Sequence, residues 1–323
     1  MRMNAAPERL LVLANLGTPV APTPAAVAAY LGEFLSDPRV VQLPRWLWRP
    51  LLRGVVLPRR SPVAARKYAS IWMEAGSPLA VHTERLAREV QARLPAWRVV
   101  AAMRYGEPAL APALRAGIAA GAREIRVLPL YPQYSTTTTA SVADVVDGVR
   151  AQAFDARIEV LDDYHVHPAW VRAVADSIIA HWETQGRGER LLLSFHGLPQ
   201  RVVDAGDPYA AQCEASAAAI ARELGLERAD IELCYQSRFG KGRWLQPATR
   251  ARLRELAARG VRTVDVVCPG FAVDCLETLE EIAQQEAERF HAIAGGMLRA
   301  IPCLNASAAH ADAIARIAGD AWN

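Results

Sequence analysis

The chain of 323 residues has few cysteines, little net charge and no long apolar run. Its five cysteines form no Cys-x-x-Cys pair, which argues against a disulfide framework or a zinc knuckle and favours a reducing cytoplasm. The 37 basic and 34 acidic residues leave a net charge of only +3, so nucleic acid is not an expected partner. No apolar stretch is long enough to span a bilayer, and the N-terminal segment lacks the features of a signal peptide.

Three common catalytic and nucleotide-binding motifs are also absent. The sequence contains no Gly-x-Ser-x-Gly, no Gly-x-x-x-x-Gly-Lys and no Gly-x-Gly-x-x-Gly. Hydrolase, nucleotide-binding and dehydrogenase functions therefore lose their usual support.

Short apolar runs alternate with longer amphipathic stretches along the whole chain. The predicted strands are 10–15, 98–102, 124–130, 157–161, 190–195, 230–234, 263–268 and 297–301. The main predicted helices are 83–93, 170–182, 212–224, 249–259 and 276–290. This alternation predicts an α/β protein with two Rossmann-like lobes, residues 1–165 and 166–323, each a four-stranded parallel sheet flanked by helices.

Two pairs of segments resemble each other between the halves. "VLANLGTP" (12–19) aligns without gaps on "LLSFHGLP" (192–199), and "GAREIRVLPLYP" (121–132) on "GVRTVDVVCPGF" (260–271). Shared turn chemistry explains such similarities in part, but the same order in both halves favours a pseudo-duplicated molecule. Since ligands of such sheets bind at the carboxyl ends of strands, we expect Leu16 and His196 to face a cleft between the lobes.

His196 ends a buried strand, where an imidazole needs a partner. By spacing alone a structural role is the more common one, and a functional role is the minority alternative. Glu277 and Glu281 are four residues apart at the start of a helix and could hold a divalent cation. Asp274 followed by Glu277 also fits a capping box, and capping is the preferred interpretation of these residues taken alone.

Residues 44–62 combine apolar side chains, including Trp46 and Trp48, with several arginines. Such a segment can lie on a membrane surface, cover a ligand, or pack on the core as an ordinary helix. The prolines and Gly54 of this segment argue against a long regular helix here.

Taken together, several motifs resemble the ferrochelatase family over nearly the whole chain. They are "LANLGTP", "FLSDPRVV", "GSPL", "RYGEP", "LPLYPQYS", "LSFHGLP", "GDPY", "YQSRFG…WL" and "CPGF…DCLETLEEI". The resemblance implies two lobes around a porphyrin cleft. It also implies insertion of Fe²⁺ into protoporphyrin IX, which yields protoheme and two protons as the last step of heme biosynthesis.

The resemblance also assigns residues. His196 and Glu277 match the family's essential histidine and glutamate, with catalytic and metal-binding roles, and Glu281 matches an outer metal position. Segment 44–80 is expected to form a porphyrin lip, with peripheral membrane contact through 44–60. The positions matched to porphyrin contacts are Leu16, Arg60, Tyr68, Ser77, Arg104, Tyr105, Tyr131, Phe271 and Asp274.

Three departures from the family pattern change the expectations. Thr136 stands where some members have a cluster-binding cysteine, and no cysteine follows Cys303, so no [2Fe–2S] cluster and no tightly bound cofactor are expected. Leu16 has no side-chain atom that could coordinate a metal ion. Gln285 interrupts the acidic row after Glu281, so an outer metal site should be weak or missing. A porphyrin carrier, or a chelatase of the same fold for another metal, remain the alternatives.

Overall fold

The computed structural model describes every residue except 1–8, 153–154, 239–241, 321 and 323. The chain divides into two compact units. Unit 1 comprises Met1–Leu130, Thr136–Asp163 and Ile314–Asn323, and unit 2 comprises Tyr131–Ser135 and Tyr164–Ala313. The main division lies between Asp163 and Tyr164, whereas the sequence suggested one cut at 165. Residues 131–135, which precede this division, belong to unit 2, and residues 314–323, at the end of the chain, belong to unit 1.

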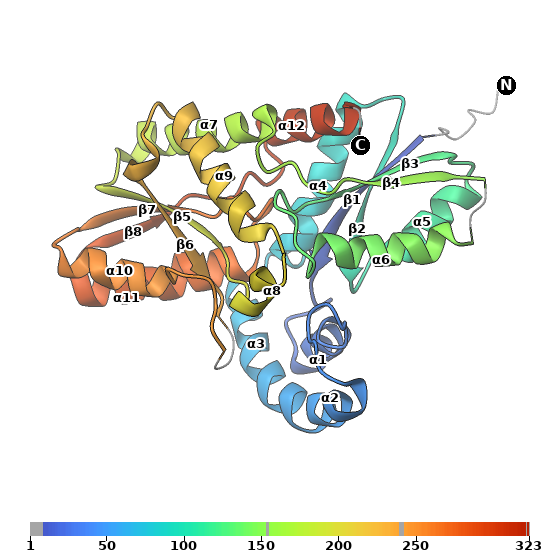
Figure 1. The fold of residues 1–323 in the computed structure, drawn as a ribbon, viewed down its shortest axis with the longest axis horizontal. Helices are drawn as coiled ribbons and strands as arrows, with labels where there is room; N and C mark the ends of the chain where they lie inside the picture. Colours follow the sequence, from blue (N-terminus) through green and yellow to red (C-terminus); the bar gives the residue numbers. More distant parts are fainter. Residues whose placement is uncertain (1–8, 153–154, 239–241, 321, 323) are drawn as a thin grey trace. The chain divides into compact units, whose positions relative to one another are not determined.

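Unit 1 contains one parallel sheet with the strand order β2-β1-β3-β4 (Figure 1). Its strands are β1 (Arg9–Gly17), β2 (Arg98–Tyr105), β3 (Glu124–Pro129) and β4 (Arg157–Val160). Its helices are α1 (Pro24–Phe34), α2 (Arg45–Leu51), η1 (Leu52–Val56), α3 (Leu57–Ile71), α4 (Pro78–Arg93), α5 (Leu110–Ala119) and α6 (Thr139–Arg150). The central strand β1 is buried from Leu10 to Asn15, as its apolar run predicts.

Unit 2 repeats this architecture with the strand order β6-β5-β7-β8, again all parallel. Its strands are β5 (Arg190–His196), β6 (Ile231–Gln236), β7 (Thr263–Val267) and β8 (Met297–Ala300). Its helices are α7 (Pro168–Gln185), α8 (Gln200–Asp204), α9 (Tyr209–Glu223), η2 (Arg228–Asp230), α10 (Thr249–Ala258), η3 (Leu276–Glu286), α11 (Ala287–Ala294) and α12 (Ala308–Gly319), within which the division falls. Helices α7 and α9 cover one face of the sheet, and α10 and α11 the other (Figure 1). The predicted fold class is confirmed.

The repeat extends to the details of the backbone. Strands β2 and β6 each form an isolated parallel bridge with a following Pro-Ala segment. Met103 N donates to Pro108 O in unit 1, and Tyr235 N donates to Pro247 O in unit 2. A glycine closely approaches the neighbouring strand in each unit: Gly17, the last residue of β1, and Gly197, the residue directly after β5. The shared strand order and these shared contacts support the pseudo-duplication inferred from the two pairs of similar segments.

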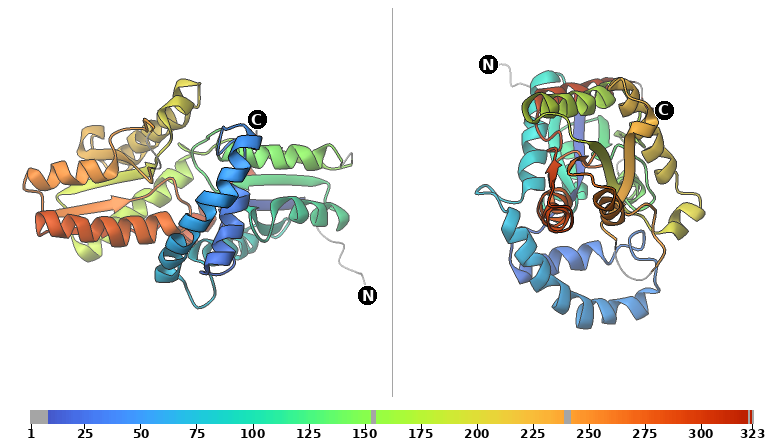
Figure 2. Two further views of the ribbon diagram at one scale, coloured as in Figure 1. Left: turned by 90° about the horizontal axis from the view of Figure 1, so that it is seen from below. Right: turned by 90° about the vertical axis from the view of Figure 1, so that its left-hand side faces the viewer.

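Residues 45–71 are helical throughout but do not form one regular α-helix, as the prolines and Gly54 led us to expect. Helices α2, η1 and α3 follow one another, and Figures 1 and 2 show them (blue) as one bent run. The chain accommodates Pro50 and Gly54 by widening to a π-helix over Leu52–Val56. Leu52 is buried, whereas Trp46 is 78% exposed. Across the described part of the chain, no helix is both long and apolar enough to cross a membrane.

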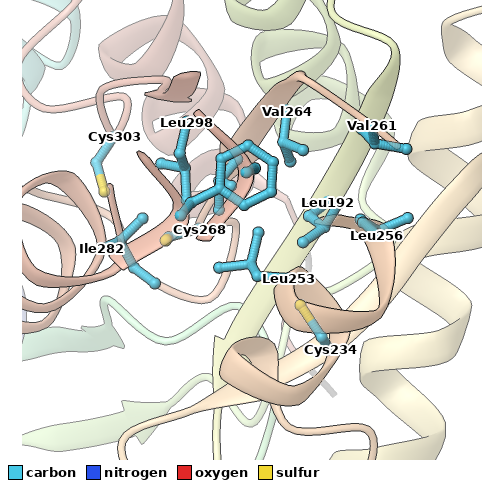
Figure 3. Close-up of a cluster of buried hydrophobic side chains, with 13 residues drawn as sticks. Leu192, Cys234, Leu253, Leu256, Val261, Val264, Cys268, Ile282, Leu298 and Cys303 are labelled. Carbon is cyan, nitrogen blue, oxygen red and sulfur yellow. The ribbon is translucent and has the colours of Figure 1, made fainter. Parts of the chain in front are cut away.

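The core of unit 2 anchors the π-helix η3 to the sheet. Ile282 of η3 and Cys268, at the end of β7, pack in one buried cluster with Leu192 of β5 and Phe290 of α11 (Figure 3). Burial of such apolar side chains contributes about 1.5–3 kcal/mol each. The cluster therefore fixes η3 beside the carboxyl ends of β5 and β7.

Candidate active site

His196 is the last residue of the central strand β5 and is half-buried. The chain turns at once, because Gly197 N donates to Gln236 O and a Cβ on Gly197 would lie 2.6 Å from that oxygen. The imidazole Nδ1 lies 2.6 Å from Gly197 O. A carbonyl only accepts, so Nδ1 carries the proton of the neutral ring and Nε2 keeps its lone pair. His196 thus presents a base or ligand atom at the strand end.

Glu277 and Glu281 lie in the first turns of η3, a π-helix rather than the α-helix suggested by the sequence. The capping box predicted for Asp274 and Glu277 is wrong. The N-cap is Cys275, whose backbone N–H donates to Thr278 Oγ1. Glu277 therefore takes no part in the capping box. The π-helical geometry is itself notable, because π-helical turns often occur at functional sites.

The two glutamates and His196 interact electrostatically. Burial raises the pKa of Glu281, hydrogen bonds from Ser237 oppose this, and the nearby Glu277 carboxylate raises the pKa further, whereas His196 lowers it. Phe271 lies beside the imidazole, with ring centroids 6.2 Å apart. The structure therefore brings together His196, Glu277, Glu281 and Phe271 within unit 2. Among the residues that the structure describes, no group of three or more His, Cys, Asp or Glu side chains could hold a metal ion.

Asp274 is buried and its carboxylate is engaged within the protein. It accepts hydrogen bonds from Thr278 Oγ1 at 2.9 Å, Asn305 Nδ2 at 2.7 Å and Cys303 N at 3.2 Å. These bonds join the start of η3 to the segment before α12. A direct contact of Asp274 with porphyrin stays a prediction.

His310 of α12 contacts Asn305, the partner of Asp274, and its buried ring makes the stability of the protein depend on pH. Its ring is fully buried, Nδ1 lies 2.6 Å from Asn305 O, and burial lowers its pKa from 6.5 to about 4. Between these values the unfolded chain binds a proton that the folded chain does not. Stability should therefore fall as the pH drops from 6.5 to 4, by up to about 1.4 kcal/mol per pH unit. We expect urea unfolding of His310→Gln to show a shallower loss over this range, and an unchanged slope would contradict the assignment.

Tyr131 belongs to a five-residue segment that packs on the start of α9. Gln133 Nε2 donates to Ser216 Oγ, and Tyr134 N donates to Gln212 Oε1. Ser135 Oγ donates to Asp207 Oδ2 at 3.0 Å. The motifs "LPLYPQYS" and "GDPY" are thus in contact with each other through Ser135 and Asp207, which the sequence did not predict.

In unit 1, Arg104 and Tyr105 share a buried carboxylate that sequence reasoning missed. Asp37 Oδ2 accepts from Arg104 at 2.6 Å, Tyr105 at 2.7 Å and Ser141 at 2.7 Å. Burial opposes ionisation of Asp37, but hydrogen bonds from Ser141 and Tyr105 outweigh it and lower its pKa. The only sequence signal was its place in "FLSDPRVV".

The remaining predicted porphyrin contacts of unit 1 lie on β1, α3 and the start of α4. Leu16 is half-buried near the end of β1, and Ser77 at the N-cap of α4 accepts from Thr18 Oγ1 at 2.7 Å. On α3, Arg60 is exposed and Tyr68 is buried. Their roles stay predictions.

Solved structures with the same fold define the class of protein. SirB from Bacillus subtilis, solved with Fe³⁺, matches with a TM-score of 0.54 and 16% identity over 75% of this chain and 90% of its own. CbiX, described as the terminal enzyme of siroheme biosynthesis in denitrifying bacteria, matches with a TM-score of 0.53 and 17% identity over 98% and 100%. At this identity the likeness establishes the chelatase fold alone.

Sequence comparison narrows this class. The family model described as Ferrochelatase matches residues 9–321. A ferrochelatase of Xanthomonas axonopodis pv. citri is 57% identical over 98% of this chain and 99% of its own length. That of Vibrio vulnificus is 45% identical over 98% and 99%. The chain belongs to the ferrochelatase family.

Proposed function

We propose that this protein is a ferrochelatase that inserts Fe²⁺ into protoporphyrin IX and releases two protons as protoheme forms. The observation that carries the proposal is the contact of His196 Nδ1 with Gly197 O, which leaves Nε2 available on a ring that interacts electrostatically with Glu281, as Glu277 does. A porphyrin carrier needs an axial ligand, but it needs no acceptors for protons beside that ligand.

The proposed chemistry uses each of these groups. Both pyrrole N–H protons must leave as Fe²⁺ binds, and a base near neutral pH removes them best. His196 accepts a proton at Nε2 while Nδ1–H stays bound to Gly197 O, which fixes the ring. Glu277 stabilises the resulting imidazolium, and Glu281, with its raised pKa, takes the proton onward. Imidazole and carboxylate also suit Fe²⁺ as a passing ligand set.

Anaerobic incubation with Fe²⁺ and protoporphyrin IX tests the function. We expect protoheme, measured as its pyridine hemochrome, with repeated turnover. A carrier would bind the porphyrin without turnover, and a chelatase for another metal would turn over only with that metal, such as Co²⁺.

Glu277→Gln tests the carboxylate. The amide has the same shape but cannot balance an imidazolium, so we expect kcat to fall about 10²-fold or more with an unchanged melting temperature. Glu288→Gln, an exposed position in α11, is the matched control and should keep wild-type kcat. Near-normal chelation by Glu277→Gln would contradict the assignment.

We also propose that the chain holds no [2Fe–2S] cluster or other tight cofactor. Thr136 offers no thiolate. Burial raises the pKa of Cys268, Cys275 and Cys303, which disfavours the thiolates that such a cluster requires.

Peripheral membrane contact through the exposed side of α2 is the last part of the proposal. Trp46, Leu47 and Leu51 are exposed there, and arginines flank them. Trp48 differs, because its Nε1 donates to Leu35 O. We expect Trp46→Ser/Leu47→Ser to lose co-sedimentation with anionic liposomes while keeping activity on detergent-dispersed porphyrin. Equal sedimentation of this variant and wild type would contradict membrane contact here.

A further inference from the structure

Ser237, the residue after β6, has an unusual backbone conformation. Its φ is +63°, and Asn305 is the other non-glycine residue with positive φ in the described part of the chain. Non-glycine residues in this region are strained, and such residues cluster at functional sites. Serine has neither the freedom of glycine nor the local hydrogen bonding of asparagine to favour this conformation. The strain therefore points to a specific contact that it serves.

The contact is with the side chain of Glu281. Ser237 N donates to Glu281 Oε1 at 2.8 Å, and Ser237 Oγ donates to Glu281 Oε2. Both carboxylate oxygens are thus held by one residue. The N–H and the hydroxyl of Ser237 thus both face the Glu281 carboxylate.

The preceding residue holds the backbone of the same helix. Gln236 is buried, and its Nε2 donates to Glu277 O at 2.8 Å. Gln236 Oε1 accepts from Ser194 Oγ at 2.7 Å, which ties it to β5 two residues before His196. The end of β6 therefore connects the strand that carries His196 to the helix that carries both glutamates.

We propose that Ser237 is a positioning residue of the chelatase site, which orients the Glu281 carboxylate toward Glu277 and His196. The inference rests on the proposed function, since it assigns Glu281 to proton or iron transfer. Ser237 itself touches neither substrate nor reacting atoms in this role. It fixes one rotamer of a half-buried glutamate that would otherwise sample several.

The internal repeat supplies an independent parallel. The bridges of Met103 and Tyr235 to their Pro-Ala segments make these two residues equivalent, so Tyr105 in unit 1 corresponds to Ser237 in unit 2. Tyr105 also donates its hydroxyl to a carboxylate, that of Asp37. The Asp37 side chain accepts four protein donors, including Arg39 N, whereas Glu281 receives only the two from Ser237 among the bonds found in the described residues. The same strand position thus holds a saturated carboxylate in one unit and one with remaining capacity in the other.

Ser237→Ala and Ser237→Gly separate the hydroxyl from the backbone strain. Alanine removes the hydroxyl and keeps the strain, whereas glycine removes both. We expect each to lower kcat/KM for Fe²⁺ about tenfold or more, because a misplaced group is costly to catalysis. The KM for porphyrin should stay within about twofold. The control is Ser177→Ala, whose hydroxyl donates to Val174 O within α7 and whose kcat and both KM values should also stay within about twofold.

A double-mutant cycle tests whether Ser237 acts through Glu281. If it does, Ser237→Ala/Glu281→Gln should be no slower than Glu281→Gln alone. Additive losses would overturn the proposal, as would full activity of Ser237→Gly or Ser237→Ala while Glu281→Gln is impaired. Full activity of the Ser237 variants with an impaired Glu281→Gln would leave the proposed active site unchanged and remove only the role of Ser237. Full activity of Glu281→Gln would instead remove Glu281 from the site and the positioning role with it.

Discussion

His196→Ala should abolish iron insertion while the protein stays folded. Removing a positioned general base typically costs about 10²–10⁴-fold in rate. The alanine also deletes the Nε2 lone pair that the Nδ1–H bond to Gly197 O keeps available. The ring is half-buried at a strand end, so its loss leaves the β5 core, from Leu191 to Phe195, intact. The measurement is protoheme formation per enzyme under anaerobic conditions, together with the melting temperature.

The matched control is His291→Ala, the same substitution at an exposed position of α11. It should keep wild-type kcat and KM. If His196→Ala retained more than about a tenth of the wild-type kcat, His196 would be neither the base nor an essential iron ligand.

Gly17→Ala should unfold unit 1 or weaken it severely. A Cβ at Gly17 would lie 1.7 Å from the carbonyl oxygen of Tyr105, which belongs to the neighbouring strand β2 and cannot move without breaking the sheet. The backbone φ of +109° adds its own strain. We expect a loss of more than about 4 kcal/mol in the free energy of unfolding, at the upper end of single substitutions.

Gly121→Ala separates the two causes. Its φ is +100°, but an added Cβ would meet nothing within 4 Å. Only the conformational cost applies there, about 1–3 kcal/mol. Equal melting temperatures for the two variants would show that the clash with Tyr105 is relieved, against the geometry of β1 and β2.

The sequence was a good guide to the sheets and a partial guide to the site. All eight strands were located because buried parallel strands are short apolar runs bounded by Gly or Pro turns. Two of them, β5 and β6, also include the polar residues His196 and Gln236 at their ends. Apolar periodicity does not extend to such residues, since their placement is decided by tertiary hydrogen bonds.

The features that sequence reasoning missed depend on tertiary contacts or on backbone geometry. The π-helical turn of η3 and the positive φ of Ser237 have no signature in residue type, because serine and glutamate are ordinary residues of turns and helices. Asp37 is far from Arg104 in the chain, so only the folded unit shows their ion pair. The segment 131–135 belongs to unit 2 through side-chain bonds to α9 and the turn before it, which no pattern along the chain predicts.

The most direct test of the proposed chemistry counts protons. Wild-type protein preloaded with protoporphyrin IX is mixed anaerobically with Fe²⁺ in weak buffer containing a pH indicator. We expect two protons to be released for each protoheme formed, at the rate at which the porphyrin spectrum changes. Binding of Fe²⁺ and porphyrin without proton release or protoheme would contradict a chelatase and leave a porphyrin carrier in its place.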